Sequence, residues 1–118
     1  MKIIIAGGRN FRDYDKLTES CDNILVNQKE VEIVSGTAAG ADTLGERYAQ
    51  EKGYEVKKFP AQWDLYGKSA GYKRNQQMAE YADGLIAFWD GKSKGTENMI
   101  SIAKRHELKL QVVHYNFQ

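Results

Sequence analysis

Segments with the character of β-strands alternate along the chain with amphipathic helical patterns. Ile3–Ala6 is apolar and mostly β-branched, as expected for a strand that is buried on both faces. Alternation of this kind is typical of a parallel sheet covered by helices on both faces. Short right-handed connections then favour the strand order 3-2-1-4-5, so the sequence predicts a three-layer α/β fold of about five mostly parallel strands. The other strand segments are Val31–Ser35, Tyr54–Phe59, Gly84–Trp89 and Leu110–Tyr115.

The helical patterns each place apolar residues on one face. Asp13 or Asp15 is expected to cap the first helix, and Gly53 to end the second. The third strand is the most polar of the set, which predicts a position at the edge of the sheet. The apolar sets are Leu17, Cys21, Ile24 and Leu25; Ala41, Leu44, Tyr48 and Ala49; Met78, Tyr81 and Ala82; and Met99, Ile100, Ile102 and Ala103.

Composition narrows the class of protein. A length of 118 residues predicts one domain, residues 1–118. The net charge of +1 gives no electrostatic argument for binding duplex nucleic acid, which usually needs a basic face. The single cysteine, Cys21, excludes an internal disulfide and a multi-cysteine zinc site, and no metal is expected. The longest apolar run, Leu85–Trp89, is too short for a membrane span, and the first residues are too few for a signal peptide. We therefore expect a cytoplasmic protein without a membrane partner.

Three glycine-rich loops follow predicted strands: Gly7–Asn10, Ser35–Asp42 and Asp90–Thr96. Open α/β sheets bind ligands at this edge. Two of the loops lead into helix N-termini, whose free N–H groups and partial positive charge suit a phosphate or carboxylate. One such loop can be only a tight turn, but three at one edge favour a shared ligand groove. Its candidate residues are Gly7, Gly8, Arg9, Ser35, Gly36, Thr37, Gly40, Asp42, Gly91, Ser93, Gly95 and Thr96.

None of these loops is a Walker A motif or a regular GxGxxG motif, so a nicotinamide cofactor is not expected. The sequence requires no other cofactor. Two acids at the ends of these loops have a simpler explanation, because Asp42 and Glu97 fall in first helical turns, where acids favour the helix dipole.

The segment Pro60–Asn75 is long for a connection between a strand and a helix, and long loops in compact domains tend to be functional. Trp63 can stack on a nucleobase, or it can pack over the end of the sheet. Lys68 and Lys73 can pair with phosphate, or they can be solvated.

Arg74 differs, because it lies on a helix whose apolar face must meet the sheet. An arginine there needs either a bound anion or an acidic partner, for which Asp42, Asp83 and Asp90 are the candidates. Arg74 and its neighbour Asn75 join the candidate binding residues.

Several of these segments together resemble a known family. The chain resembles the YspA/YpsA-related branch of the SLOG superfamily, in order and over essentially its whole length. SLOG proteins use a Rossmann-like fold to bind nucleotides or their derivatives, so the resemblance implies a Rossmann-like fold and a ligand of that class. The segments that carry the resemblance are Ile5–Tyr14, Ser35–Asp42, Pro60–Trp63, Ala70–Met78 and Gly91–Thr96.

The superfamily includes LOG-type phosphoribohydrolases, which split a nucleoside monophosphate into base and ribose 5-phosphate. Arg74 and Met78 fit an arginine and a methionine that those enzymes show, and Gly91 with Gly95–Thr96 loosely fits their PGGxGTxxE loop. Asn75 stands where those enzymes have a lysine, and Met99 replaces the acid of GTxxE. A methionine cannot act as a general base or stabilise an oxocarbenium-like centre. No catalytic residue is therefore assigned.

These observations leave three hypotheses. The first is a domain that binds a small nucleotide-derived molecule as a sensor or by sequestering it. The second is a hydrolase of the N-glycosidic or phosphoester bond of a nucleotide, using Arg74 and an acid among Asp42, Asp90 and Glu97. The third is single-stranded DNA binding, suggested by the SLOG relative DprA and opposed by the charge of +1. LOG-type relatives are dimers, so the resemblance also implies a homodimer.

Overall fold

A computed structural model describes residues 1–116 of the chain. Its sheet has five strands in the order β3-β2-β1-β4-β5, and every neighbouring pair is parallel. This confirms the strand order predicted from the sequence, including the polar third strand at an edge. The strands are β1 (Lys2–Gly7), β2 (Glu32–Ser35), β3 (Glu55–Lys58), β4 (Gly84–Trp89) and β5 (Lys109–His114).

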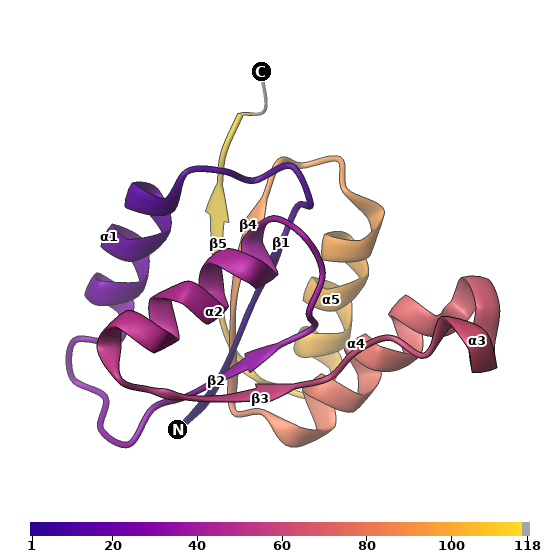
Figure 1. The fold of residues 1–118 in the computed structure, drawn as a ribbon, viewed down its shortest axis with the longest axis horizontal. Helices are drawn as coiled ribbons and strands as arrows, with labels where there is room; N and C mark the ends of the chain where they lie inside the picture. Colours follow the sequence, from indigo (N-terminus) through magenta and orange to yellow (C-terminus); the bar gives the residue numbers. More distant parts are fainter. Residues whose placement is uncertain (117–118) are drawn as a thin grey trace.

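Helices cover both faces of the sheet (Figure 1). Ile3 and Ile5 of β1 pack in one cluster with α1 and α2, whereas Ile4 and Ala6 pack in the other with α4 and α5. Alternate residues of a strand point to opposite faces, so β1 contributes to both cores. The three-layer prediction is confirmed. The helices are α1 (Tyr14–Ile24), α2 (Ala41–Lys52), α4 (Ala70–Tyr81) and α5 (Lys94–Arg105).

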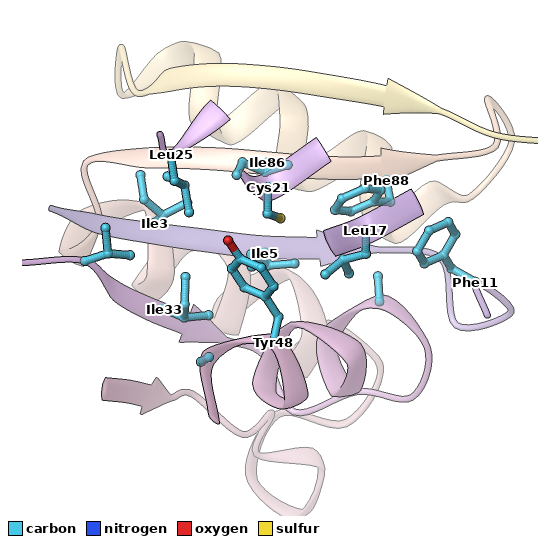
Figure 2. Packing of buried hydrophobic residues seen from close by; sticks show 13 residues of the cluster. Ile3, Ile5, Phe11, Leu17, Cys21, Leu25, Ile33, Tyr48, Ile86 and Phe88 are labelled. Atoms are coloured by element: carbon cyan, nitrogen blue, oxygen red, sulfur yellow. The ribbon is translucent and has the colours of Figure 1, made fainter. Parts of the chain in front are cut away.

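The core under α1 and α2 is built from large apolar side chains, as Figure 2 shows. Cys21 of α1 is fully buried there between strand and helix residues. Burial raises the pKa of the Cys21 thiol to about 12, which keeps it protonated and unreactive. Tyr48 of α2 buries its ring in the same cluster and donates its hydroxyl hydrogen to Asp22 Oδ1 at 2.8 Å.

The helix ends follow the capping residues. Asp13 caps α1 by accepting a hydrogen bond from the backbone N–H of Lys16 at 3.0 Å. Gly53 ends α2 in the left-handed conformation, with φ of 75°. No helix within residues 1–116 is long and apolar enough to cross a membrane.

One sequence prediction is corrected. The segment expected as a long loop before the third main helix contains α3 (Trp63–Tyr66) and the 3₁₀ turn η1 (Gly67–Ser69), and α4 already begins at Ala70. The apolar periodicity missed them because α3 and η1 bury no side chain. Figure 1 shows α3 projecting beyond α4, away from the sheet.

Candidate functional site

A cavity of about 570 Å³ lies at the carboxyl ends of the central strands. The loops after β1 and β4, the start of α2, and the segment from α3 to α4 form its walls. Segments distant in the sequence therefore converge at the edge that the glycine-rich loops predicted. The predicted residues that line it are Gly7, Gly8, Arg9, Asp42, Trp63, Arg74, Asn75, Ser93, Gly95 and Thr96.

Other predicted residues do not line the cavity but shape the loops around it. Gly40 adopts φ of 78°, and a side chain there would meet the backbone of Gly8 and Arg9. Only glycine combines this conformation with so close an approach of two chain segments. Gly91 also has a positive φ, of 83°, in an open turn after β4.

The start of the loop after β2 lies behind the residues that line the cavity, and hydrogen bonds fix it there. The hydroxyl of Ser35 donates to Glu46 Oε2 at 2.6 Å and accepts from the N–H of Thr37 at 3.1 Å. Thr37 is held at φ of 62°, which is costly for a β-branched residue. Gly36 contributes a carbonyl oxygen, which accepts a hydrogen bond from Arg74 Nη1. This part of the loop therefore supports the cavity wall without lining it, through Ser35, Gly36 and Thr37.

Arg74 lies in the wall of the cavity on α4. Besides its bond to Gly36, its Nε donates to Asn75 Oδ1 at 3.0 Å. A guanidinium has five N–H donors, and the other three make no hydrogen bond to the residues that the structure describes. Burial lowers the pKa of Arg74 and the nearby Asp42 carboxylate raises it, but an arginine stays charged at any physiological pH.

The structure selects among the acidic partners considered for Arg74. Asp83 accepts from the backbone N–H of Lys2 at 2.9 Å, on another part of the chain. Asp90 accepts from backbone groups of its own loop. Asp42 is the acid whose charge acts on Arg74, although the two make no ion pair within 4.0 Å. Arg74 is therefore positioned by neutral acceptors and faces one carboxylate.

Asn75 joins the two helices that flank the cavity. Its Nδ2 donates to Asn98 Oδ1 of α5 at 3.0 Å, and its Oδ1 accepts from Arg74 Nε. The side chain is buried, so these bonds are shielded from water. Asn75 thus fixes the orientation of the arginine against α5.

Asp42 lies in the first turn of α2 and is only 5% exposed. Its Oδ2 accepts from the backbone N–H of Ala38 at 3.1 Å. Desolvation raises the pKa of Asp42 to about 6, and the Ala38 N–H and the charge of Arg74 oppose that rise. A carboxylate is therefore kept at the cavity wall at some cost in free energy.

The loop after β4 forms the opposite wall. Asp90 Oδ1 accepts from the N–H groups of Lys92 at 2.8 Å and Ser93 at 2.9 Å, and these bonds lower the pKa of Asp90. Ser93 caps α5, with its Oγ accepting from the N–H of Thr96. The loop is thus fixed by its own side chains.

Sequence reasoning missed some wall residues and undervalued others. Lys68 and Lys92 line the cavity with Arg9 and Arg74, against the two acids Asp42 and Asp90. The excess of cations favours an anionic ligand. The sequence leaves open whether Lys68 pairs with phosphate or is solvated, and the structure places it, in η1, at the wall. The remaining wall residues are Ala6, Asn10, Ala38, Gly71, Tyr72, Met78 and Met99.

Two aromatic side chains stand at the cavity. Trp63 is 51% exposed and Tyr72 is 48% exposed, and both belong to the wall. Trp63 therefore does not pack over the sheet end in the way that one interpretation of the sequence allowed. Within residues 1–116, no group of three or more His, Cys, Asp and Glu side chains is arranged to hold a metal ion.

The five-stranded parallel sheet, with a cavity at its carboxyl edge, defines a Rossmann-like α/β protein. The chain belongs to the YspA, cpYpsA-related SLOG family, whose model matches residues 1–66. This confirms the family that the sequence motifs indicated. The chain is also 30% identical over 111 residues to the Gene 61 protein of Mycobacterium phage D29, covering 88% of this chain and 89% of that protein.

Solved structures share the fold. DNA processing protein A (DprA) of Streptococcus pneumoniae superposes with a TM-score of 0.76 at 19% identity, covering 98% of this chain and 51% of that one. DprA of Helicobacter pylori, a protein with a single-stranded DNA binding mode, gives a TM-score of 0.71 at 19% identity, covering 100% and 67%. The chain thus spans about half of the first protein and two thirds of the second. At this identity the likeness shows the fold.

Proposed function

We propose that the cavity binds a nucleotide or nucleotide derivative and that the protein acts as a sensor or sequestering domain. The observation that carries the proposal is Arg74, a partly buried arginine with free donors, beside Arg9 in a cavity wall. An arginine held in this way is suited to bind phosphate through charge-assisted hydrogen bonds.

The rest of the wall fits the other parts of a nucleotide. The half-exposed ring of Trp63 offers a face on which a base can stack. The volume of about 570 Å³ falls in the range of small-molecule sites. Membership of the SLOG family is consistent with a nucleotide-derived ligand.

The test is a panel of ribonucleoside mono- and diphosphates, followed by thermal unfolding and by chromatography of the products. A ligand at about 100 times its Kd should stabilise the protein by about 2.7 kcal/mol, or several degrees of Tm. Arg74→Ala should lose most of that shift. The matched control is Lys73→Ala, the exposed neighbour that lies over the Tyr66 ring at 4.9 Å. A shift without product favours binding over hydrolysis.

Two outcomes would reject the proposal. One is the absence of any shift in the unaltered protein, and the other is a full shift in Arg74→Ala. The ligand-free Arg74→Ala protein should unfold about 1–3 kcal/mol more easily, because the Gly36 carbonyl loses its donor. That loss is read separately from the ligand shift.

Single-stranded DNA is the second candidate ligand. Tyr66 and Tyr72 are exposed near Trp63, and Lys73 lies over the Tyr66 ring, so aromatic and cationic groups alternate from α3 to α4. Such surfaces bind single strands by stacking and by phosphate contacts. The likeness to the Helicobacter pylori protein supports this candidate. Binding of labelled oligothymidylate, with no response to mononucleotides, would favour it over the first.

A further inference from the structure

The carboxylate of Asp42 has one oxygen that the protein leaves open. The residue is only 5% exposed, and it belongs to the cavity wall. Oδ2 is occupied by the N–H of Ala38. Within residues 1–116, Oδ1 has no hydrogen-bond partner. It is also not one of the fully buried polar atoms without a partner, so part of its surface remains accessible. A nearly buried acceptor is therefore directed into the cavity.

The chemistry of that oxygen limits what can meet it. A carboxylate only accepts hydrogen bonds, so its partner must be a donor. A phosphate cannot be that partner, because two anions would face each other in a dry site. The described side chains around Asp42 do not supply three ligands for a metal ion. The partner is thus a neutral or cationic donor on the ligand.

The neighbouring residues indicate which part of the ligand supplies this donor. The charges of Arg74 and Arg9 both act on Asp42, so the anion-binding groups lie beside it. Trp63, the stacking candidate, belongs to a different segment of the wall, α3. In a nucleotide the group that adjoins the phosphate and carries hydroxyl donors is the sugar.

We infer that Asp42 accepts a hydrogen bond from a ribose hydroxyl, so that the site selects nucleotides that carry this hydroxyl over the deoxy forms that lack it. This inference rests on the proposed function and names its substrate class. A sugar that lacks the hydroxyl leaves the buried carboxylate unpaired, and sites with a buried polar group reject such analogues strongly. Loss of a charge-assisted bond corresponds to about a tenfold to hundredfold loss of affinity.

The experiment compares matched sugars on the same base. The probe is the ribonucleoside 5′-monophosphate, among those of A, G, C and U, that binds most tightly, together with its 2′-deoxy and 3′-deoxy forms. Calorimetric titration should show at least one deoxy form binding about tenfold weaker or more. The measured quantity is the ratio of the Kd of the deoxy form to the Kd of the ribonucleotide. In Asp42→Ala that ratio should fall to within about twofold of unity, because the residue that distinguishes the sugars is gone.

Two further variants separate a contact from a structural role. Asp42→Asn keeps an acceptor for the Ala38 N–H and removes the charge, so it should fold and still lose most of the ratio. Asp83→Asn is the matched control, because its Oδ2 also accepts a backbone N–H, that of Lys2 at 2.9 Å, but it lies outside the cavity wall, and it should keep the ratio. A purely structural Asp42 would weaken all three sugars equally and leave the ratio unchanged.

The outcomes are distinct. Equal binding of the three sugars to the unaltered protein, or a ratio that persists in Asp42→Ala, would overturn the inference and leave nucleotide binding intact. Failure of every ribonucleotide to bind would overturn the proposed function itself, and the inference with it.

Discussion

The guanidinium of Arg74 and the carboxylate of Asp42 both lie directly beside the α-carbon of Gly36. A Cβ at that position would lie 2.7 Å from Arg74 Nη1 and 2.8 Å from Asp42 Oδ2. The residue is thus small because two charged side chains from α4 and α2 occupy the space beside it. Gly36 does not line the cavity, yet it sets where the wall residues can stand.

The first prediction is that Gly36→Ala weakens ligand binding more than it weakens the fold. The new methyl group must displace Arg74, which is bonded to the carbonyl of the same residue. Gly71→Ala is the comparison, since it adds a methyl group to the cavity wall itself but at ordinary distances of 3.7 and 3.9 Å from the Trp63 and Arg74 side chains, and it should weaken binding less. Titration with the best nucleotide of the panel measures both. Equal affinities of the two variants would contradict this packing argument.

The second prediction concerns pH. The folded protein raises the pKa of Asp42 to about 6 from 3.8, so between these values the folded state binds more protons than the unfolded state. The contribution of Asp42 to stability therefore falls as pH rises through this window, by about 3 kcal/mol in total. Asp42→Asn, which cannot ionise, should gain stability relative to the unaltered protein between pH 4 and pH 7.

Urea unfolding of both proteins at the two pH values measures that gain. Both proteins contain the other titratable groups, so the comparison cancels their effects on stability. Asp90 is one such group, and its lowered pKa favours the folded state at higher pH, opposite to Asp42. A difference between the two proteins that is the same at pH 4 and pH 7 would show that Asp42 ionises in the folded state much as it does in solution.

The fold was largely predictable because its determinants are local. The alternation of strand and helix patterns, the apolar β1 and the polar edge strand β3 all appear in short windows of sequence. The edge at which the glycine-rich loops converge followed from the parallel topology. By contrast, α3 and η1 bury no side chain, so they have no periodic apolar pattern from which they could be predicted.

The details of the site depend on contacts between distant segments. Gly40 was predicted to bind the ligand, but the structure places the backbone of Gly8 and Arg9 against it. Asp42 had the ordinary explanation of an acid at a helix start, but the structure buries it beside Gly36, whose carbonyl accepts a hydrogen bond from Arg74 of α4. The signal for Lys92 and Asp90 was weak, because a charge near a turn is usually solvated.

The third prediction is that the protein does not hydrolyse adenosine monophosphate as LOG-type enzymes do. Met99, at the position of their acid, is 1% exposed and lines the cavity, while Glu97 lies exposed and outside it. Incubation and chromatography should yield no ribose 5-phosphate above a protein-free control. Met99→Glu alone should not restore activity, because Asn75 also departs from the motif. Product formation by the unaltered protein would point instead to Asp42 or Asp90 as the acid.

The last prediction is that Trp63 reports the binding of the base. Its ring is half exposed at the cavity, whereas the indole N–H of Trp89 is already held by the Ser93 carbonyl at 3.1 Å. Stacking of a base should bury Trp63 and change its fluorescence. Trp63→Phe should lose most of that change, and Trp63→Ala should weaken binding by about 1–3 kcal/mol. Leu65→Ala, which alters an exposed side chain of α3 outside the cavity wall, should leave both fluorescence and affinity unchanged. If a nucleotide binds with full affinity to Trp63→Ala, the base lies elsewhere in the cavity and the aromatic rim serves another purpose.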